Sequence, residues 1–521
     1  MKTFRFKVFK QYLWMALFVI LMRLFFNLVF AEFSLVVAQN AIVEGGKLAL
    51  WVLGFGLFNA AVDIRKLLKR TPSFLSGFTT ALTISMSLVP EMASNISRVR
   101  EASKLRSARS GSRLVQSVIV PVLSNAVDQA IQLAESMEHR GFGQKTNTKN
   151  EATELRLDNF SFGYSEQQKI FDQASFALNA GQFALVSGDT GSGKSTLLRI
   201  LKAHYPDAAL VGQLPRKGFV SDTVRDELAF ALVQQRLSKT EINQRVASQA
   251  NEFSLNSFLD QDPVELSAGW QQRVAIAASL ISGGTVLLLD EPFSALDDAA
   301  TAQVLETLMS LKNKGITIVV AEHRINTVSR LADQTFRVEN QKITEGPPKE
   351  QHLSPCRSDI GKITALVGPN GSGKTTHLRK LAQESGVLVP QPASDLLFLD
   401  SVRAELTQAD TDAKIAAGTT EGILQSFQVS INFEANPRDL SEGQKLSLAL
   451  AIQLAKPTSL LLLDEPTLGF DTASRQTLAN LICKLAATGV EIIVATHDNE
   501  FAAAVANKTM TIADGVISNA A

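Results

Sequence analysis

Two long apolar runs dominate the start of the chain. Residues 12–31 are apolar apart mainly from Arg23 and Asn27, and a run of this length is enough to cross the hydrocarbon core of a bilayer. An uncharged run at 48–62 is shorter and would serve as the returning half of a hairpin. A cleaved signal peptide has a shorter apolar region and a small-residue cleavage site, so we expect residues 12–31 to span a membrane.

Two later segments are also largely apolar but lie beside basic clusters. Residues 71–90 carry no charge and separate a cluster at 65–70 from another at 98–113. Basic clusters favour the cytoplasmic side, and one crossing between two of them would break that rule, so we expect this segment at the membrane interface or packed on other helices. Residues 114–137 predict an amphipathic helix that needs a partner surface, with a soluble bundle helix as the alternative.

Beyond residue 150 the pattern changes to short apolar runs, each followed by a glycine-rich loop and a helical pattern. The runs at 183–187 and 363–367 precede G-x-x-x-x-G-K-[ST] at 188–195 and 368–375. Glycines let backbone N–H groups converge on phosphate oxygens, and the helix N-terminus adds positive partial charge. The lysine would reach the β and γ phosphates, and the last hydroxyl would bind Mg²⁺. Two such motifs, each between a strand and a helix, predict two phosphate-binding domains.

The rest of the repeat keeps the same spacing in both copies. LSAGW begins at residue 266 and LSEGQ at residue 440, and each is followed by an apolar strand that ends in an acid pair, Asp290-Glu291 or Asp464-Glu465. The Ser of LSAGW or LSEGQ lies 23 residues before the Asp of the acid pair in both copies. The His of AEHR or ATHD lies 33 residues after that Asp in both copies. These motifs resemble the signature, Walker B and His motifs of ATP-binding cassette (ABC) domains, here called cassette one and cassette two.

The resemblance implies ATP hydrolysis by in-line attack of water on the γ-phosphoryl group. Each Asp of the acid pairs would hold Mg²⁺ through water, and each following Glu would orient or deprotonate the attacking water. We therefore assign catalysis to Glu291, His323, Glu465 and His497, and Mg²⁺ contacts to Ser195, Gln213, Asp290, Thr375, Gln391 and Asp464. Gln213 and Gln391 are the Q-loop glutamines of the family, and Asp297 and Asp471 are its D-loop residues.

In this family each signature loop closes on the ATP of the other cassette. Site one would therefore use the P-loop of cassette one with the signature of cassette two, and site two the reverse, with both sites hydrolysing ATP. Trp270 departs from the usual Gln or Glu of the signature and affects site two. The residues assigned to nucleotide are Tyr164, Gly188, Gly191, Gly193, Lys194, Ser195, Thr196, Gln213, Ser267, Gly269, Asp290, Gly368, Gly371, Gly373, Lys374, Thr375, Thr376, Gln391, Ser441, Gly443, Gln444 and Asp464.

The two copies differ where the adenine base would bind. Tyr164 lies 30 residues before Lys194 and could stack on the base, as the A-loop aromatic residue does in the family. Cassette two has no aromatic residue between Phe336 and Phe398, and its Pro-containing start lacks room for a full antiparallel subdomain. We expect adenine contact in cassette two to be weaker or differently made.

The segment before the cassettes resembles the coupling helices of the transmembrane T component of energy-coupling-factor (ECF) importers. ASKLRS at 102–107 and EHRG at 138–141 match the short motifs that end those helices, although the first lacks the usual Gly. The family implies that Arg106 and Arg140 dock in grooves of the cassettes. The expected fold class is an N-terminal α-helical membrane and coupling-helix segment (1–143), a linker (144–158), and two α/β P-loop NTPase domains (159–343 and 361–521) joined by a second linker (344–360).

Charge and composition narrow the remaining alternatives. The chain has equal numbers of acidic and basic residues, but residues 1–150 hold 19 Lys and Arg against 8 Asp and Glu. This asymmetry favours a membrane surface or an acidic partner domain, and we expect no nucleic acid. The two cysteines exclude a disulfide framework and a cysteine metal site.

We therefore expect an ATP- and Mg²⁺-dependent energising module for import of a vitamin or metal ion, at a bacterial-type cytoplasmic membrane. Its cassettes would pair within the chain, its partners would be a separate substrate-binding membrane protein (the S component) and a further membrane subunit, and its ATPase domains would face the cytoplasm. The alternatives are a conventional ABC permease or exporter ATPase with a reduced membrane part, and a soluble tandem-cassette protein of translation or DNA repair. Against the soluble alternative stand the apolar N-terminus and the short gap between cassettes.

Overall fold

The computed structural model describes most of the two cassettes and parts of the N-terminal segment. The chain divides into two compact units, Met1–Val89 and Pro90–Ala521. The predicted coupling residues Arg106 and Arg140 lie outside the described residues. The described residues are 12–22, 35–61, 133, 136–137, 153–165, 168–235, 237–323, 328–347, 352–356, 362–513 and 515–519.

The N-terminal unit is helical where it is described. Residues 12–22 form a helix, and α2 spans Leu35–Ala61 with an ion pair of 2.7 Å between Lys47 and Glu44. Large apolar side chains are exposed on both helices, and Trp51 is 81% exposed. Among the described residues, no helix combines the length and hydropathy needed to span a bilayer. The predicted span 12–31 is described only as far as residue 22.

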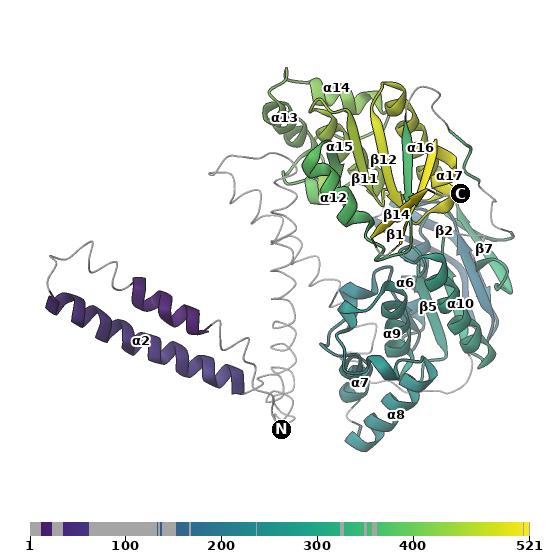
Figure 1. Ribbon diagram of the computed structural model, residues 1–521. Helices are drawn as coiled ribbons and strands as arrows, with labels where there is room; N and C mark the ends of the chain where they lie inside the picture. Colours follow the sequence, from purple (N-terminus) through teal and green to yellow (C-terminus); the bar gives the residue numbers. More distant parts are fainter. Residues whose placement is uncertain are drawn as a thin grey trace. The chain divides into compact units, whose positions relative to one another are not determined.

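Cassette one consists of an antiparallel hairpin and a six-stranded sheet flanked by helices (Figure 1). The hairpin strands are β1 (Leu155–Ser165) and β2 (Gln168–Leu178), so β1 begins inside the predicted linker. The sheet has the order β4-β5-β6-β3-β7-β8, in which only the β7–β8 pair is antiparallel. Its strands are β3 (Phe183–Ser187), β4 (Ala209–Val211), β5 (Val286–Asp290), β6 (Thr317–Ala321), β7 (Gln334–Glu339) and β8 (Lys342–Glu345); its helices are α6 (Lys194–His204), α7 (Val224–Gln234), α8 (Lys239–Glu252), α9 (Ala268–Leu280) and α10 (Asp298–Asn313).

Cassette two repeats this sheet with the order β10-β11-β12-β9-β13-β14. Among its described residues there is no counterpart of the β1–β2 hairpin. Its strands are β9 (Ile363–Val367), β10 (Val387–Val389), β11 (Leu460–Asp464), β12 (Glu491–Thr496), β13 (Lys508–Ala513) and β14 (Val516–Asn519); its helices are α12 (Lys374–Glu384), α13 (Val402–Ala413), α14 (Thr419–Ser426), α15 (Glu442–Leu454), α16 (Thr472–Ala487) and α17 (Asn499–Val505).

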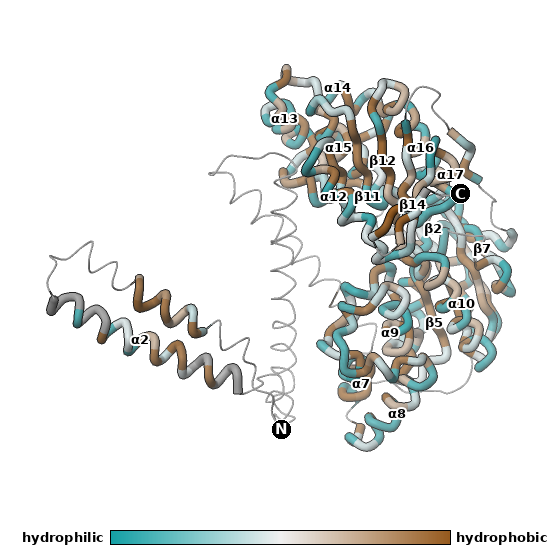
Figure 2. Tube along the Cα trace, in the orientation of Figure 1, coloured by the Kyte–Doolittle hydropathy of each residue, from teal (hydrophilic) through white to brown (hydrophobic). Residues whose placement is uncertain are grey.

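Burial of the central strands explains their composition. Every residue of β3 and β6 is buried, and the apolar runs colour the sheets brown in Figure 2. Parallel strands covered by helices on both faces lose their polar alternation, which is why the sequence shows continuous apolar runs. Because β6 lies between β3 and β5, the P-loop, the acid pair and the His-bearing loop leave the sheet at adjacent carboxyl ends. The prediction of two α/β P-loop domains is confirmed.

Candidate nucleotide-binding sites

The first P-loop joins β3 to α6. Gly191 and Gly193 have φ angles of 81° and 110°, which residues with side chains rarely adopt. A Cβ on Gly188 would lie 2.6 Å from a backbone carbonyl oxygen of β7, so no larger residue fits there. The ammonium group of Lys194 is buried and donates to the carbonyl oxygens of Gly188 and Asp189 at 2.7 and 3.1 Å. The loop is therefore a glycine cradle with a cation at its base.

The second P-loop, between β9 and α12, has the same construction. Gly371 and Gly373 have φ angles of 80° and 101°. Lys374 donates to the carbonyl oxygens of Gly368 and Pro369 at 2.6 and 3.1 Å. A Cβ on Gly368 would clash with a backbone carbonyl oxygen of β13. Both loops therefore satisfy the local requirements of a phosphate-binding loop.

Each P-loop hydroxyl is hydrogen-bonded to the Walker B Asp. Ser195 Oγ donates to Asp290 Oδ1 at 3.0 Å, and Thr375 Oγ1 donates to Asp464 Oδ1 at 3.1 Å. Burial raises the pKa of Asp290 and of Asp464, although the hydrogen bonds to their hydroxyl partners lower it. A hydroxyl and a buried carboxylate side by side are hard oxygen ligands suited to Mg²⁺.

The P-loops also carry polar atoms that suit phosphate. The hydroxyl oxygens of Ser192 and Ser372 are buried and have no hydrogen-bond partner among the described residues. Buried polar groups are normally satisfied, so each marks a position where a ligand oxygen or water is expected. Thr196 and Thr376 follow in the first turn of their helices, as the sequence predicted. The donor set of both loops thus fits Mg²⁺ and a triphosphate.

Glu291 is held in an uncommon backbone conformation in cassette one. Its φ angle is 46°, and its backbone N–H donates to the carbonyl oxygen of Ala321 at 2.8 Å. Gln213 Nε2 donates to Glu291 Oε2 at 2.8 Å. His323 Nδ1 lies 3.2 Å from Glu322 Oε1 and 3.6 Å from Glu291 Oε2. The carboxylate of Glu291 is therefore restrained mainly by the glutamine.

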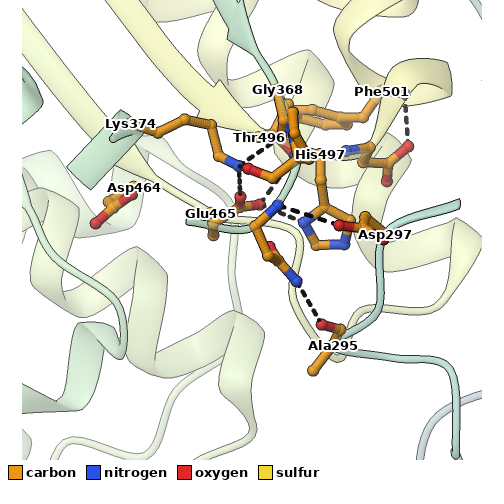
Figure 3. A network of polar contacts seen from close by, with 12 residues as sticks. Ala295, Asp297, Gly368, Lys374, Asp464, Glu465, Thr496, His497 and Phe501 are labelled. Atoms are coloured by element: carbon orange, nitrogen blue, oxygen red, sulfur yellow. Dashed lines mark hydrogen bonds and ion pairs between the residues drawn. The ribbon is translucent and has the colours of Figure 1, made fainter. Parts of the chain in front are cut away.

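Glu465 has the same backbone conformation in cassette two, with φ at 45°, but different partners. Its two oxygens lie 3.2 Å from Lys374 Nζ and 2.9 Å from His497 Nδ1. Figure 3 shows the three side chains together. Burial alone would raise the pKa of Glu465, but the hydrogen bond with His497 and the charges of His497 and Lys374 lower it overall. Among the described residues, Gln391 makes no hydrogen bond to Glu465. The glutamate of cassette two is thus held by the P-loop lysine and the histidine.

Glu322 is a site residue that the sequence analysis did not single out. Its side chain is 0% exposed, and Oε1 accepts the backbone N–H of His323 at 2.8 Å. Cassette two has Thr496 at the matching position, where Oγ1 accepts the backbone N–H of Asp498 at 3.0 Å. The sequence signal for this residue was the Glu in AEHR where the second copy has Thr in ATHD. In cassette one the position therefore provides a second carboxylate beside the histidine, whereas in cassette two it provides a hydroxyl.

The signature motifs begin α9 and α15 and also differ. Ser441 and Gln444 form a reciprocal capping box, in which Ser441 Oγ accepts the N–H of Gln444 at 3.3 Å. Ser267 makes no side-chain capping hydrogen bond in the described structure. Trp270, in the place of Gln444, instead packs its ring 4.5 Å from that of Phe258 and under the guanidinium of Arg273 at 4.4 Å. The substitution thus removes the partner that would complete a capping box.

The D-loops connect each cassette to the P-loop of the other. Asp471 Oδ2 accepts the backbone N–H of Thr190 at 2.7 Å, and Asp297 Oδ2 accepts that of Asn370 at 3.2 Å. Asn370 also donates its amide to the carbonyl oxygen of Ala295 at 3.0 Å (Figure 3). The two cassettes therefore contact one another reciprocally.

The signature glycines lie directly behind these D-loops. A Cβ on Gly269 would lie 2.9 Å from the Cβ of Ala300, whose backbone N–H is bound by the N-cap Asp297. A Cβ on Gly443 would lie 3.9 Å from the ring of Phe470, the residue before Asp471. Each signature glycine thus lies next to residues adjoining the D-loop aspartate that contacts the P-loop of the other cassette.

Tyr164 lies at the end of β1 beside the first P-loop. It is 65% exposed, its ring meets that of Phe162 edge-on at 5.4 Å, and its hydroxyl lies 3.4 Å from Thr196 Oγ1. An exposed aromatic face at this point can stack on a base, so the predicted role of Tyr164 is compatible with its position.

Comparisons with known proteins identify the type of domain. Residues 171–294 match the family model described as ABC transporter, and residues 417–503 match an AAA domain model of AbiEii toxin, type IV TA system. An ABC transporter ATP-binding protein of Streptomyces coelicolor is 29% identical, over a match that covers 70% of this chain and 93% of that protein. A Bacillus subtilis protein named for HMP/thiamine import ATP binding is 24% identical, over 69% of this chain and 90% of that protein.

Some solved structures match parts of this chain at low identity. The cbiO1 structure from Clostridium perfringens, part of the ABC transporter complex cbiONQ, is 24% identical with a TM-score of 0.36, covering 38% of this chain and 89% of that one. A model of ribosome-bound archaeal Pelota and ABCE1 is 19% identical with a TM-score of 0.49, covering 66% and 74%. The family match and the curated relatives show that the chain carries ABC ATPase domains, is an ATPase, and binds ATP with Mg²⁺.

Proposed function

We propose that this ATPase is the energising module of an ECF-type importer, in which ATP hydrolysis drives the import of a small solute. The observation that carries this proposal is a contact between the predicted coupling segment and cassette one. Ser136 Oγ donates to the carbonyl oxygen of Gly218 at 2.9 Å. Leu133, which lies three residues before Ser136, is buried, and so is Met137, which directly follows it. The described part of the segment just before the EHRG motif therefore contacts an ATPase domain.

The contact lies close to the catalytic glutamate of cassette one. Gly218 ends a 3-10 turn, Pro215–Gly218, that follows the Q-loop residue Gln213. A cavity of about 250 Å³ is lined by Ser136, by Gly218 and Gln213, and by the Mg²⁺-site residues Ser195 and Asp290. Gln213 donates to Glu291, so movement of the 213–218 segment would reposition the catalytic carboxylate. This provides a short physical connection between the coupling segment and hydrolysis.

The residues of each site have separate tasks in hydrolysis. Lys194 and Lys374 neutralise phosphate charge, and backbone N–H groups of the glycine loops orient the triphosphate. Glu291 and Glu465 hold the attacking water in line, with His323 and His497 beside them. The hydroxyl and carboxylate pair of each site would hold Mg²⁺. When bound, the ion would neutralise negative charge on the phosphate oxygens.

The rest of the proposal follows from the ECF resemblance and from the named relatives. The relatives named as ABC transporter ATP-binding proteins align with about the share of the chain that the two cassettes occupy. Residues 1–143 would then be the membrane and coupling part, at a cytoplasmic membrane with the cassettes on the cytoplasmic side. A separate S component would capture the cargo, a vitamin or a metal ion. A vitamin-type cargo is compatible with the relative named for HMP/thiamine import.

Charge reversal at Arg140 tests the coupling role. In cells, Arg140→Glu should abolish solute uptake while the purified protein still binds ATP, because the arginine belongs to none of the nucleotide-binding motifs of the sequence. Lys145→Glu, five residues further on, is the matched control and should retain uptake. Uptake by Arg140→Glu at the control rate would contradict the proposal.

Membrane association gives an independent test. The full chain should resist carbonate extraction from membranes and should copurify with a small hydrophobic protein, whose identity would define the cargo. A chain that washes off the membrane and sediments with ribosomes would instead support a tandem cassette ATPase of translation.

A further inference from the structure

The two P-loops are covered by different parts of their cassettes. In cassette one the cover is strand β2, because a Cβ on Gly193 would lie 2.7 Å from Ile170 Cγ2 and 3.1 Å from the ring of Phe171. The same hairpin carries Tyr164, the predicted base contact. Cassette two has no such hairpin among its described residues, so another element must cover its P-loop.

That element is the turn between β13 and β14. Gly515 donates its backbone N–H to the carbonyl oxygen of Ser372 at 3.0 Å. A Cβ on Gly373 would lie 3.5 Å from Gly515 Cα. Gly373 corresponds to Gly193, since each is the N-cap of its P-loop helix. The turn therefore occupies the place beside the P-loop that β2 occupies in cassette one.

The matching turn of cassette one makes a different contact. The β7–β8 hairpin of cassette one corresponds to the β13–β14 hairpin of cassette two. A Cβ on Gly188 would meet the carbonyl oxygen of Val338 in β7, and a Cβ on Gly368 would meet that of Ile512 in β13. In cassette one the turn residue Gln341 accepts the backbone N–H of Asp172, which belongs to β2. The turn thus contacts β2 in cassette one, and it contacts the P-loop itself in cassette two, whose described part includes no such strand.

Val516 directly follows this contact. It is 70% exposed, which is unusual for a branched apolar side chain in a strand. Its counterpart in cassette one is the charged residue Lys342, three positions after Glu339 as Val516 is after Ala513. An exposed apolar side chain beside a phosphate-binding loop has the chemistry to pack on the face of a nucleotide base.

We propose that the β13–β14 turn forms the base-binding surface of site two, with Val516 packing on the adenine of ATP in the place of an aromatic residue. This rests only on the ATP binding of the cassettes and not on the importer proposal. An aliphatic side chain offers less contact area than a tyrosine ring, so base recognition in site two is weaker than in site one.

Equilibrium binding of radiolabelled ATP to the purified full chain tests this assignment. A Lys194→Ala background restricts tight binding to site two. There, Val516→Asp should weaken ATP binding about fivefold and Val516→Tyr should tighten it about threefold, because the first removes apolar area from the base and the second adds to it. Val233→Asp, at an exposed valine in α7, is the matched control and should bind as the background does.

Two further measurements separate base contact from damage to the P-loop. Inorganic tripolyphosphate has no base, so its competition at site two should be unchanged by Val516→Asp. In a Lys374→Ala background, which leaves site one, Val516→Asp should have no effect and Tyr164→Ala should weaken ATP binding. Unchanged ATP affinity of Val516→Asp at site two, or an equal loss of tripolyphosphate binding, would overturn the assignment.

Discussion

Asp471 uses its two carboxylate oxygens for two different partners. Oδ1 accepts the backbone N–H of Ser474 at 2.7 Å and so caps α16, while Oδ2 accepts the backbone N–H of Thr190 in the opposite P-loop at 2.7 Å. Asp297 does the same with Ala300 and Asn370. Because the cap already fixes each side chain, little conformational freedom is lost when the cassettes meet.

Replacing these aspartates by asparagine should separate the two contacts. Asn caps a helix as well as Asp does. The NH₂ group that replaces Oδ2 is a hydrogen-bond donor, however, and would face the backbone N–H of the opposite P-loop, which is also a donor. We expect Asp471→Asn and Asp297→Asn each to lower ATP turnover about tenfold or more, with thermal stability nearly unchanged. Steady-state ATPase assays and melting curves measure this. Turnover equal to wild type in both variants would mean that the contact has no part in hydrolysis.

The two catalytic glutamates should both be needed. Glu291→Gln and Glu465→Gln keep the shape of the side chain but remove the base, so each should lower turnover about 100-fold at its own site while ATP binding persists. Single-turnover hydrolysis in each variant resolves the two sites. If only one of the substitutions changes the rate, the prediction of two hydrolytic sites is wrong.

The signature serines offer a matched pair. Ser441→Ala removes a capping hydrogen bond and should destabilise the protein by about 1 kcal/mol, whereas Ser267→Ala removes none and should change stability by less than about 0.5 kcal/mol. Denaturant titration compares the two. Loss of activity in a stable Ser267→Ala variant then reports a contact with nucleotide. An equal loss of stability in both variants would contradict the difference in capping.

Asp464 should make the nucleotide-free protein less stable at neutral pH. Burial raises its pKa in the folded state above the value in the unfolded chain, so stability is lost as pH rises through that raised pKa. Asp464→Asn should therefore raise the melting temperature by roughly 2–4 °C at pH 7.5 in EDTA. The gain should vanish below the ordinary aspartate pKa of about 3.9, where the side chain is protonated in both the folded and the unfolded chain. The same variant should lose Mg²⁺-dependent hydrolysis. A gain that persists at acid pH would have to come from a cause other than the charge.

The parts of the fold that the sequence predicted are those defined by local rules. The glycine loops need left-handed backbone at fixed positions, and strands covered on both faces need continuous apolar runs. Both features can therefore be recognised in the sequence alone. The offsets from Ser267 and Ser441 located the two acid pairs in the sequence, and the structure has each pair at the carboxyl end of a central strand. The β1–β2 hairpin was harder to delimit, because β1 begins at Leu155 in a polar stretch that resembles a linker.

The differences between the two sites depended on contacts distant in sequence. Lys374 pairs with Glu465, whereas Gln213 donates to Glu291, although the lysines, glutamines and glutamates have the same motif positions in both copies. Gly515 contacts the second P-loop in a cassette whose described residues include no counterpart of the β1–β2 hairpin. Such substitutions of one element by another have no local pattern in the sequence. The roles of the individual site residues, Arg106 and Arg140 included, stay predictions.

The backbone of Glu291 and Glu465 has a consequence for laboratory evolution. Both residues have φ near +45°, where a side chain costs about 1–3 kcal/mol that glycine would not incur. A selection that rewards heat resistance alone would therefore replace these two glutamates early, and it would deliver robust proteins that bind ATP and no longer turn it over. Any programme to stabilise this chain must hold both positions fixed.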